Sequence, residues 1–445
     1  MRALARCLSV VAAVSRAATG AGASTLDDAL ALAYHNNPEL LAQRAALRAT
    51  DEGVSEARSG WRPTVTATGE VGTTSVDTTG TRTPESYTLS LRQPVFRGGR
   101  TVAATREAEN LVLAARARLT EVEQDVLLRA VTVYMDVWRA GAVVDLAINN
   151  ERRLERTLEA TRDRFEVGDV SRTDVAQAKS RLSTAIADRI RARGDLTATR
   201  AAYLNVVGVA PDAVAPPTPL GGLPGDAANA RETAAAGHPA LLRAIYIERA
   251  ARAAARKAMG EIFPEVSLNA ELRHAEEQSA SSGTTKSASL TARVTIPLYQ
   301  SGGEYARVRA AREVIAQRRL DIERSRRAVI ENTTQSWQAL ETARAQITAF
   351  EDAVRAAEIA FEGAEQEATV GTRTTLDVLD AEQELFNAKV DLVSARRDEV
   401  VSSYAVAAAI GRLSARALGL AVEIYNEIRH YEAVRNKLWG FGPGQ

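Results

Sequence analysis

The two halves of this chain repeat one another at an almost constant separation. The run Asn-Pro-Glu-Leu-Leu around Pro38 returns as His-Pro-Ala-Leu-Leu around Pro239. The matching pairs, 201 to 203 positions apart, are Pro38 and Pro239, Pro63 and Pro264, Pro94 and Pro297, Gly168 and Gly371, and Gly208 and Gly411. Solenoid repeats are only about 20–50 residues long. We therefore expect a tandem duplication, with one complete set of elements in residues 24–225 and another in residues 226–412.

The N-terminus has the features of a secretory signal peptide. Arg2 and Arg6 precede a short apolar run at 8–14, and Ala-Gly-Ala at 21–23 is a small-residue cleavage pattern. We expect residues 1–23 to be removed. Cys7 is the single cysteine, and it precedes the apolar run, which argues against a lipid-anchored form. The mature chain then has no thiol for disulfides.

The composition argues against several functional classes. Lys+Arg and Asp+Glu each number 56, so the net charge of zero gives no electrostatic footprint for nucleic acid. The four histidines are scattered, at His35, His238, His274 and His430, and we find no metal-ligand, nucleotide or hydrolase motif. We therefore expect no enzyme activity, no cofactor and no metal site. No run of 18 apolar residues occurs, so the sequence predicts no transmembrane helix and leaves strands as the route into a membrane.

Four segments alternate between apolar and polar residues with the period of a β-strand. They are residues 64–71 and 87–92 in the first half, with a polar loop at 73–85 between them, and residues 266–273 and 289–296 in the second. Strands of about 10 residues with one apolar face suit a transmembrane barrel. A half-buried soluble sheet gives the same alternation. The signal peptide and the lack of any larger core favour the membrane.

Helical periodicity fills most of the remaining chain. A first helix is expected at 25–58, opened by Thr25 and Asp28 as a capping box. Residues 100–165 predict a helix about 100 Å long. Its apolar stripe has coiled-coil spacing and consists of Ala115, Leu119, Val122, Val126, Ala130, Val133, Val137, Ala140 and Val144. After a break, a second helix is expected at 173–207, and the second half matches with helices at 304–369 and 376–410.

Each half thus predicts a helix, two strands and a long helical hairpin. Four strands cannot close a barrel, and an open sheet cannot lie in lipid with unpaired edges. Three copies of the chain would supply twelve strands, which lies within the range of membrane barrels. We therefore expect a mixed fold of membrane β-strands and long helices in a homotrimer.

The turn of the second hairpin carries the most specific motif. Residues 370–382 read V-G-T-R-T-T-L-D-V-L-D-A-E, which resembles the TolC-like outer-membrane efflux proteins. Residues 167–178 are a weaker counterpart, and the N-P-E-L, Q-P-V-F-R-G-G and I-P-L-Y-Q-S-G-G segments match the same family. The resemblance covers roughly residues 25 to 435. The tail at 413–445, with H-Y-E and R-N-K-L-W, resembles that of the type I secretion members.

The resemblance implies a complete architecture and a role. Three protomers would form a twelve-stranded barrel in the outer membrane, continued by a hollow twelve-helix cylinder across the periplasm. The tail at 413–445 would pack on the periplasmic part. A periplasmic adaptor protein and an inner-membrane transporter would be the partners, together with outer-membrane lipid. The channel would conduct substrates passively to the outside in an efflux or type I secretion system.

The resemblance also implies roles for residues at the far end of the cylinder. Asp377 and Asp380 map onto an inward-facing aperture ring, and Arg373 maps onto an aperture lock with Thr173 and Asp174 of the first hairpin. Gly168 and Gly371 mark the hairpin turns. Family members often have a tyrosine where this chain has Ala368, so one bond of the lock is missing here.

Plainer interpretations of these aspartates remain open. Asp174 and Asp377 each stand three residues after a serine or threonine, which fits a capping box. Asp380 fits a solvated helix face. For the whole protein, the alternatives are a dedicated small-molecule drug or metal efflux channel and, in a different class, a periplasmic coiled-coil adaptor.

Overall fold

The computed structural model describes residues 25–77, 80–211, 213–276 and 283–442, so the expected signal peptide lies outside the described residues. The chain divides into two compact units, which are treated separately below. The first unit consists of the segment ending at Asn36, Leu128–Gly221 and Leu340–Tyr404. The second consists of Asn37–Leu127, Gly222–Ala339 and the segment that begins at Ala405. None of the helices within the described ranges is both long and apolar enough to cross a membrane.

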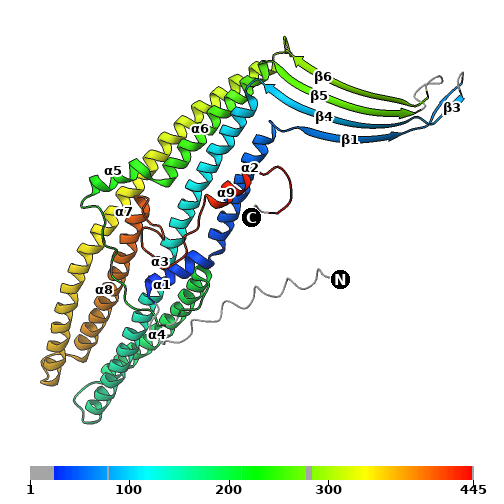
Figure 1. The fold of residues 1–445 in the computed structure, drawn as a ribbon. Coiled ribbons are helices and arrows are strands. Elements are labelled where there is room, and N and C mark those ends of the chain that lie inside the picture. The colour runs from blue at the N-terminus through cyan, green and yellow to red at the C-terminus, as the bar shows by residue number, and fades with distance from the viewer. Residues whose placement is uncertain (1–24, 78–79, 212, 277–282, 443–445) are drawn as a thin grey trace. The chain divides into compact units, whose positions relative to one another are not determined.

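Helices make up most of the chain, and the same kinds of element recur in both halves of the sequence (Figure 1). The helices are α1 (Leu26–Asn36), α2 (Pro38–Ser59), α3 (Arg100–Glu166), α4 (Arg172–Val207), α5 (Ala227–Gly237), α6 (Pro239–Met259), the 3-10 turn η1 (Gly260–Ile262), α7 (Gly303–Thr369), α8 (Thr375–Ala409) and α9 (Arg429–Val434). The strands are β1 (Thr64–Val71), β2 (Thr74–Val76), β3 (Gly80–Arg82), β4 (Glu85–Arg97), β5 (Glu265–Glu276) and β6 (Thr285–Thr295).

The long helices lie where the periodicity predicts them, and the first helix does not. Thr25 and Asp28 form the expected capping box, with Thr25 Oγ1 donating to Asp28 Oδ2 at 2.7 Å. The single helix expected at 25–58 is wrong, because the helix ends at Asn36 and a new one starts at Pro38. Asn37 is extended and its side chain accepts from the amides of Glu39 and Leu40, so it caps α2 while proline fills the first helical position.

The predicted stripe on α3 is buried along most of its length, and Leu127, Val131, Tyr134 and Met135 outside it are buried as well. Its buried members are Leu119, Val122, Val126, Ala130, Val137, Ala140 and Val144, while Ala115 and Val133 are half-buried. Steps of three and four residues place these side chains on one side of the helix. The stripe contains alanine and valine more than leucine, so neighbouring helices can approach closely.

The four expected strands form one antiparallel sheet in the order β1-β4-β5-β6, and Figure 1 shows them curving side by side. Residues opposite one another in an antiparallel sheet share a face. One row across the sheet is Ala67, Leu89, Leu272 and Ala288, and the next is Val65, Leu91, Ala270 and Leu290. The row between them, on the other face, is Thr66, Ser90, Glu271 and Ser289. The sheet therefore has one apolar and one polar face.

The apolar face is open in the chain on its own. Val65 is 63% exposed, Leu272 55% and Leu290 78%. The loop expected at 73–85 is partly wrong, because β2 and β3 form a small hairpin there. Threonine and serine suit a strand as well as a loop.

A close backbone contact fixes the junction between β4 and α3 within the second unit. Gly98 has φ +61°, and a Cβ built on it would lie 2.2 Å from the carbonyl oxygen of Gly260. A Cβ on Gly260 would lie 2.7 Å from the Gly98 carbonyl oxygen. Any side chain at either position would force the two backbones apart, so the turn can form in this place only with glycine.

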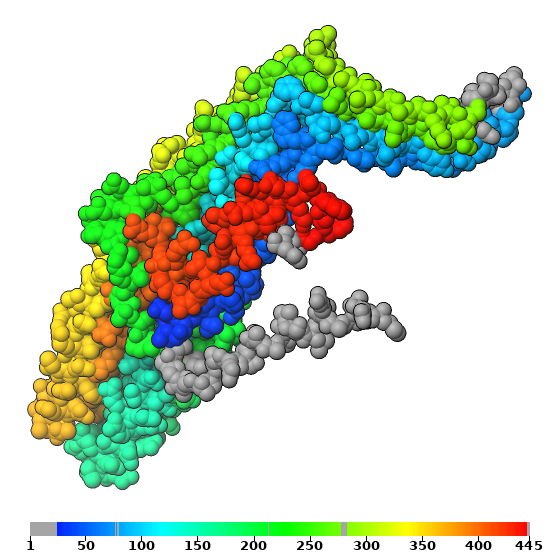
Figure 2. All heavy atoms as spheres, viewed as in Figure 1, coloured from blue at the N-terminus to red at the C-terminus, as the bar shows by residue number. Residues whose placement is uncertain are grey.

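The C-terminal tail packs on α2 and on the first part of α3, both in the second unit. The amide of Ala415 donates to Glu123 at 2.8 Å, and His430 Nδ1 lies 3.1 Å from Asp51 Oδ2. Asp51 is buried, and desolvation raises its pKa although His430 opposes the shift. In Figure 2 the tail lies in red along the blue and cyan atoms of these helices. The tail is thus held by specific contacts at several points.

Candidate functional site: the hairpin tips of the first unit

Both long hairpins reverse direction through the same backbone conformation. Gly168 follows α3 with φ +79°, and Gly371 follows α7 with φ +81°. The amide after each glycine bonds to the carbonyl five residues back, Asp169 to Arg164 at 2.9 Å and Thr372 to Glu367 at 3.0 Å. This is the Schellman end of a helix, in which a left-handed residue allows the last carbonyls to be satisfied. Gly168 and Gly371 therefore set where the hairpins reverse.

Asp174 and Asp377 both cap the helix that follows the turn. Ser171 Oγ donates to Asp174 Oδ2 at 2.7 Å, and Thr374 Oγ1 donates to Asp377 Oδ2 at 2.8 Å. Asp174 also accepts from the backbone amide of Ser171, and Asp377 accepts from the backbone amide of Thr374. These hydrogen bonds stabilise the carboxylate form and hold the pKa of both aspartates below the ordinary value. Both residues thus have a structural role at the tips.

Each turn also contains a local ion pair. Arg373 Nε donates to Glu367 Oε2 at 2.9 Å, so the guanidinium bonds to the helix that precedes its own turn. At the first turn, Arg164 Nε donates to Asp169 Oδ2 at 2.7 Å. Arg373 and Thr173 are exposed, and Asp174 is half-buried. Within this protomer, therefore, Glu367 and not Thr173 or Asp174 is the partner observed for Arg373.

Asp380 lies one turn into α8 and links the two hairpins. Its Oδ1 accepts from Arg181 of α4 at 2.5 Å, and its side chain is 57% exposed. A half-exposed pair of this kind contributes at most about 1 kcal/mol to stability. The pair nevertheless fixes the side of α8 on which Asp380 lies, which is the side that faces α4.

A buried charge pair lies deeper between the hairpins, and the sequence interpretation missed it. Glu382 of α8 is 1% exposed, and its Oε1 lies 3.5 Å from Nε of Arg153 in α3. Neither carboxylate oxygen has a hydrogen-bond partner among the residues that the structure describes. Desolvation raises the pKa of Glu382 to about 7, with Arg153 and Arg156 opposing the shift and Glu365 adding to it. Glu382 therefore titrates near neutral pH.

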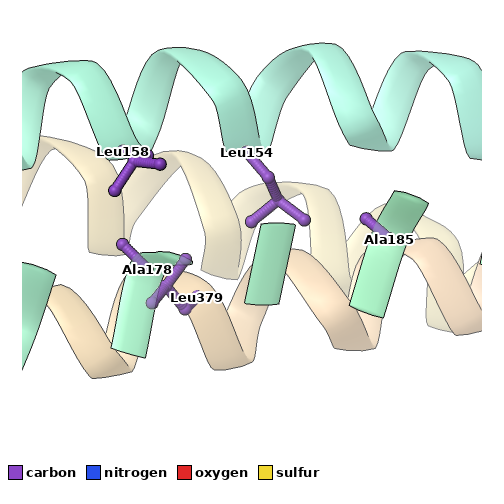
Figure 3. Close-up of a cluster of buried hydrophobic side chains, with 5 residues drawn as sticks. All are labelled: Leu154, Leu158, Ala178, Ala185 and Leu379. Carbon is purple, nitrogen blue, oxygen red and sulfur yellow. The ribbon is translucent and has the colours of Figure 1, made fainter. Parts of the chain in front are cut away.

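Apolar packing surrounds these charges. Leu154 and Leu158 of α3 point toward Ala178 of α4 and Leu379 of α8, as Figure 3 shows, and Ala185 extends the cluster along α4. A second cluster joins Ala364, Ala368 and Val378, with Phe361 packed against it. Ala368 is thus a buried packing residue at the position where a lock tyrosine is expected. The Arg153 guanidinium lies 5.6 Å from the centre of the Phe361 ring.

The sheet with one open apolar face and the paired helical hairpins define an outer-membrane exit channel. The family model described as outer membrane efflux protein matches residues 29–209 and 230–412, so this chain belongs to that family. The outer membrane efflux protein BepC of Brucella suis biovar 1 is 36% identical over 417 residues, covering 94% of this chain and 91% of that protein. The outer membrane protein TolC of Escherichia coli K12 is 25% identical over 411 residues, covering 85% of this chain and 80% of TolC.

The fold is that of solved channels of this kind. The CmeC outer membrane channel of Campylobacter jejuni superposes with a TM-score of 0.78 at 15% identity, covering 87% of this chain and 85% of CmeC. The TolC-like resemblance of the sequence is therefore confirmed, and so is the predicted outer-membrane location with a periplasmic extension. The chain is an exit channel for efflux or type I secretion.

Proposed function

We propose that three copies of this chain close a twelve-stranded barrel in the outer membrane and continue as a twelve-helix cylinder. The observation that carries the proposal is the sheet: its apolar rows are open to the surroundings, and β1 and β6 are its edges among the described residues. In lipid, an unpaired edge would leave a row of backbone groups without hydrogen bonds, which costs several kcal/mol for each group. Pairing β6 of one protomer with β1 of the next removes both edges.

The trimer is tested by mass measurement in mild detergent, with a pair of neighbouring variants. We expect three chains per particle. Leu290→Arg places a charge on the apolar face and should cost about 2–4 kcal/mol near the bilayer centre, whereas Ser289→Arg on the polar face should be tolerated. Trimer yield should then fall for Leu290→Arg alone. A monomer in mild detergent, or equal yields for the two variants, would contradict the barrel.

The helical hairpins form the periplasmic part in this proposal. A periplasmic adaptor protein and an inner-membrane transporter bind there, and the transporter supplies the energy. The protein itself performs no chemistry and conducts passively. The duplicated sequence supports this arrangement, because two similar hairpins in each of three protomers give a ring of six nearly equivalent units.

The hairpin tips form the aperture. Asp377 and Asp380 form a ring of carboxylates at the opening that attracts cations. The ion pair with Arg181 of α4 offsets part of the charge of Asp380, so Asp377 contributes more to this ring. Arg373 closes the aperture by bonding to Asp174 or Thr173 of a neighbouring hairpin. The exposure of Arg373 supports this role, since its pair with Glu367 is local and half-exposed and can be exchanged at little cost.

A further inference from the structure

The last described residues present large apolar side chains to the surroundings. Leu438 is 72% exposed, Trp439 89% and Phe441 111%. These three residues are called the tail patch below. Exposed apolar residues scattered singly are ordinary on a protein surface, but a contiguous group marks a contact with another molecule or a membrane. The tail patch therefore needs a partner of apolar chemistry.

The backbone just before the tail patch is held in place. Ser55 Oγ donates to the carbonyl of Lys437 at 3.2 Å, and Arg58 Nη1 donates to Asn436 Oδ1 at 2.7 Å. Ser55 and Arg58 both lie in the last turns of α2. The tail patch is thus fixed at the C-terminal end of α2.

That end of α2 is where the chain enters the membrane sheet. Strand β1 starts at Thr64, five residues after α2 ends at Ser59. Trp61 lies between them and is 41% exposed, and its carbonyl accepts from Gln93 Nε2 of β4 at 2.9 Å. A hollow of about 580 Å³ joins the two regions, and its lining includes Arg58, Trp61, Arg62, Arg106, Asn436 and Leu438. The tail patch is therefore continuous with the base of the sheet.

The hollow is basic. Arg58, Arg62 and Arg106 line it, and Glu109 is the one acidic residue among the described residues of its lining, 3.5 Å from Arg58. Tryptophan beside arginine is the combination that suits the boundary between lipid headgroups and acyl chains, because the ring takes the apolar side and the guanidinium binds phosphate. Lipid is the occupant that the position favours, because Trp61 and the arginines lie beside the start of β1, where the proposed barrel meets the headgroups.

We propose that the tail patch inserts into the periplasmic leaflet of the outer membrane, with Arg62 and Arg106 binding phospholipid phosphates above the hollow. The proposal rests on the barrel proposed for the sheet, since β1 sets the level of the membrane. The C-terminal tail then has two roles, because it packs on α2 and α3 and also anchors the base of the barrel to lipid.

Brominated lipids, which quench tryptophan emission on contact, test the proposal. The full-length protein is reconstituted into vesicles of phosphatidylcholine and phosphatidylglycerol with bromine near the headgroup or deep in the chains. The emission of Trp439 is the difference between the wild type and Trp439→Phe. We expect shallow bromine to remove most of this emission and deep bromine to remove less. Trp337→Phe is the matched control. It gives the emission of Trp337 by the same difference, and neither bromine position should quench this emission, because Trp337 is only 8% exposed.

Two further arms separate the outcomes. If acrylamide in the water quenches Trp439 and brominated lipid does not, the tail patch lies in the periplasm and the proposal is wrong. If neither quenches it, another protein surface covers it and the proposal is wrong again. Arg62→Gln with Arg106→Gln should reduce the shallow quenching, and unchanged quenching would overturn the role of the two arginines.

A tryptophan placed on the sheet tests the barrel independently. Leu290→Trp should be quenched by deep bromine if β6 faces lipid. Quenching of Leu290→Trp without quenching of Trp439 would overturn the tail proposal and leave the barrel intact. Absence of quenching at both positions would count against the barrel itself.

Discussion

The two hairpin turns have the same backbone, and the local ion pair of one is reversed in the other. Each ends its first helix at a left-handed glycine and starts the next with a hydroxyl residue and an aspartate. Four residues before the glycine, the first turn has Arg164, paired with Asp169 beyond the glycine. At the same place the second turn has Glu367, paired with Arg373. Both turns thus carry a local ion pair across the glycine, with the positions of the cation and the anion exchanged between them.

The reversed polarity of the ion pairs matters in the proposed ring, where the hairpin tips meet one another. After the glycine, the first turn carries Asp169, Arg172 and Asp174, while the second carries Arg373 and Asp377. Both turns keep the capping aspartate, so the difference between them is confined to the local ion pair. In the proposed ring, where the two kinds of hairpin alternate, Arg373 of one tip lies next to a tip that carries Asp174. A bond between these two residues would favour the closed state of the proposed aperture.

The largest expected effect concerns the buried pair that joins the two hairpins. Arg153→Met removes the partner of Glu382 and leaves an uncompensated buried charge, which costs about 3–5 kcal/mol. Hydrogen exchange of the tip amides at pH 8 should report this loss as faster local opening. Glu382→Gln in the same background should restore most of the protection. If Arg153→Met exchanges like the wild type at pH 8, Glu382 is not charged in the folded state.

The same pair makes the tips pH-dependent. Because the folded pKa of Glu382 is raised to about 7, its contribution to stability is fully present below about pH 4.5 and is lost as pH rises through 7. The tips should therefore open less at pH 5 than at pH 8, by up to about 3 kcal/mol. Glu382→Gln should remove this dependence, and Arg153→Met should cost less at pH 5. A pH-independent cost would contradict the assignment.

A smaller effect tests whether the two turns are equivalent. Gly168→Ala and Gly371→Ala each place a Cβ on a left-handed residue, and a built Cβ meets nothing within 4 Å at either position. Only backbone strain remains, so each variant should lose roughly 1–2 kcal/mol. Local opening measured by hydrogen exchange should change by the same amount in both hairpins. A cost at Gly371 well above that at Gly168 would show that the second turn makes further contacts in the assembled protein.

The smallest effect on stability comes from reversing one ion pair. Glu367→Arg with Arg373→Glu keeps a pair within the second turn, so local stability should change by less than about 1 kcal/mol. The tip, however, then repels its neighbours. Single-channel conductance in a planar bilayer should rise, as it should for Arg373→Ser. Conductance that rises for Arg373→Ser and not for the double variant would place the lock within the turn and not between hairpins.

Much of the fold could be predicted from the sequence because its patterns are long. The long helices repeat their apolar stripe over many turns, and the four strands alternate over most of their length, so periodicity locates them. The bounds of β4 were less predictable, because the strand continues through Pro94 to Arg97 with a shift in register between Pro94 and Phe96, whereas the sequence predicts only 87–92. The break at Asn37 was missed because proline in the first turn of a helix does not disturb helical spacing. The β2–β3 hairpin was missed because Thr and Ser residues serve loops and strands alike.

The candidate site was predictable where a motif marks it, and less so in its interior. Gly168, Gly371 and the two capping aspartates are local features, so the sequence shows them directly. Composition alone groups Glu382 with the other carboxylates on a solvated face. A signal was present: Leu379, Glu382 and Phe386 follow one another at steps of three and four, so Glu382 has the phase of a core residue. Contacts between protomers have no such local signature.

The open edges of the sheet also determine when this protein can finish folding. The helical hairpins bury their cores within one chain and can form at any protein concentration. Strands β1 and β6 must wait for another chain, so the last step of the proposed assembly is an encounter whose rate depends on concentration. Until then each monomer exposes edges and an apolar face that favour aggregation. The protein must therefore be kept soluble between secretion and insertion, and its slowest step should become slower as expression falls.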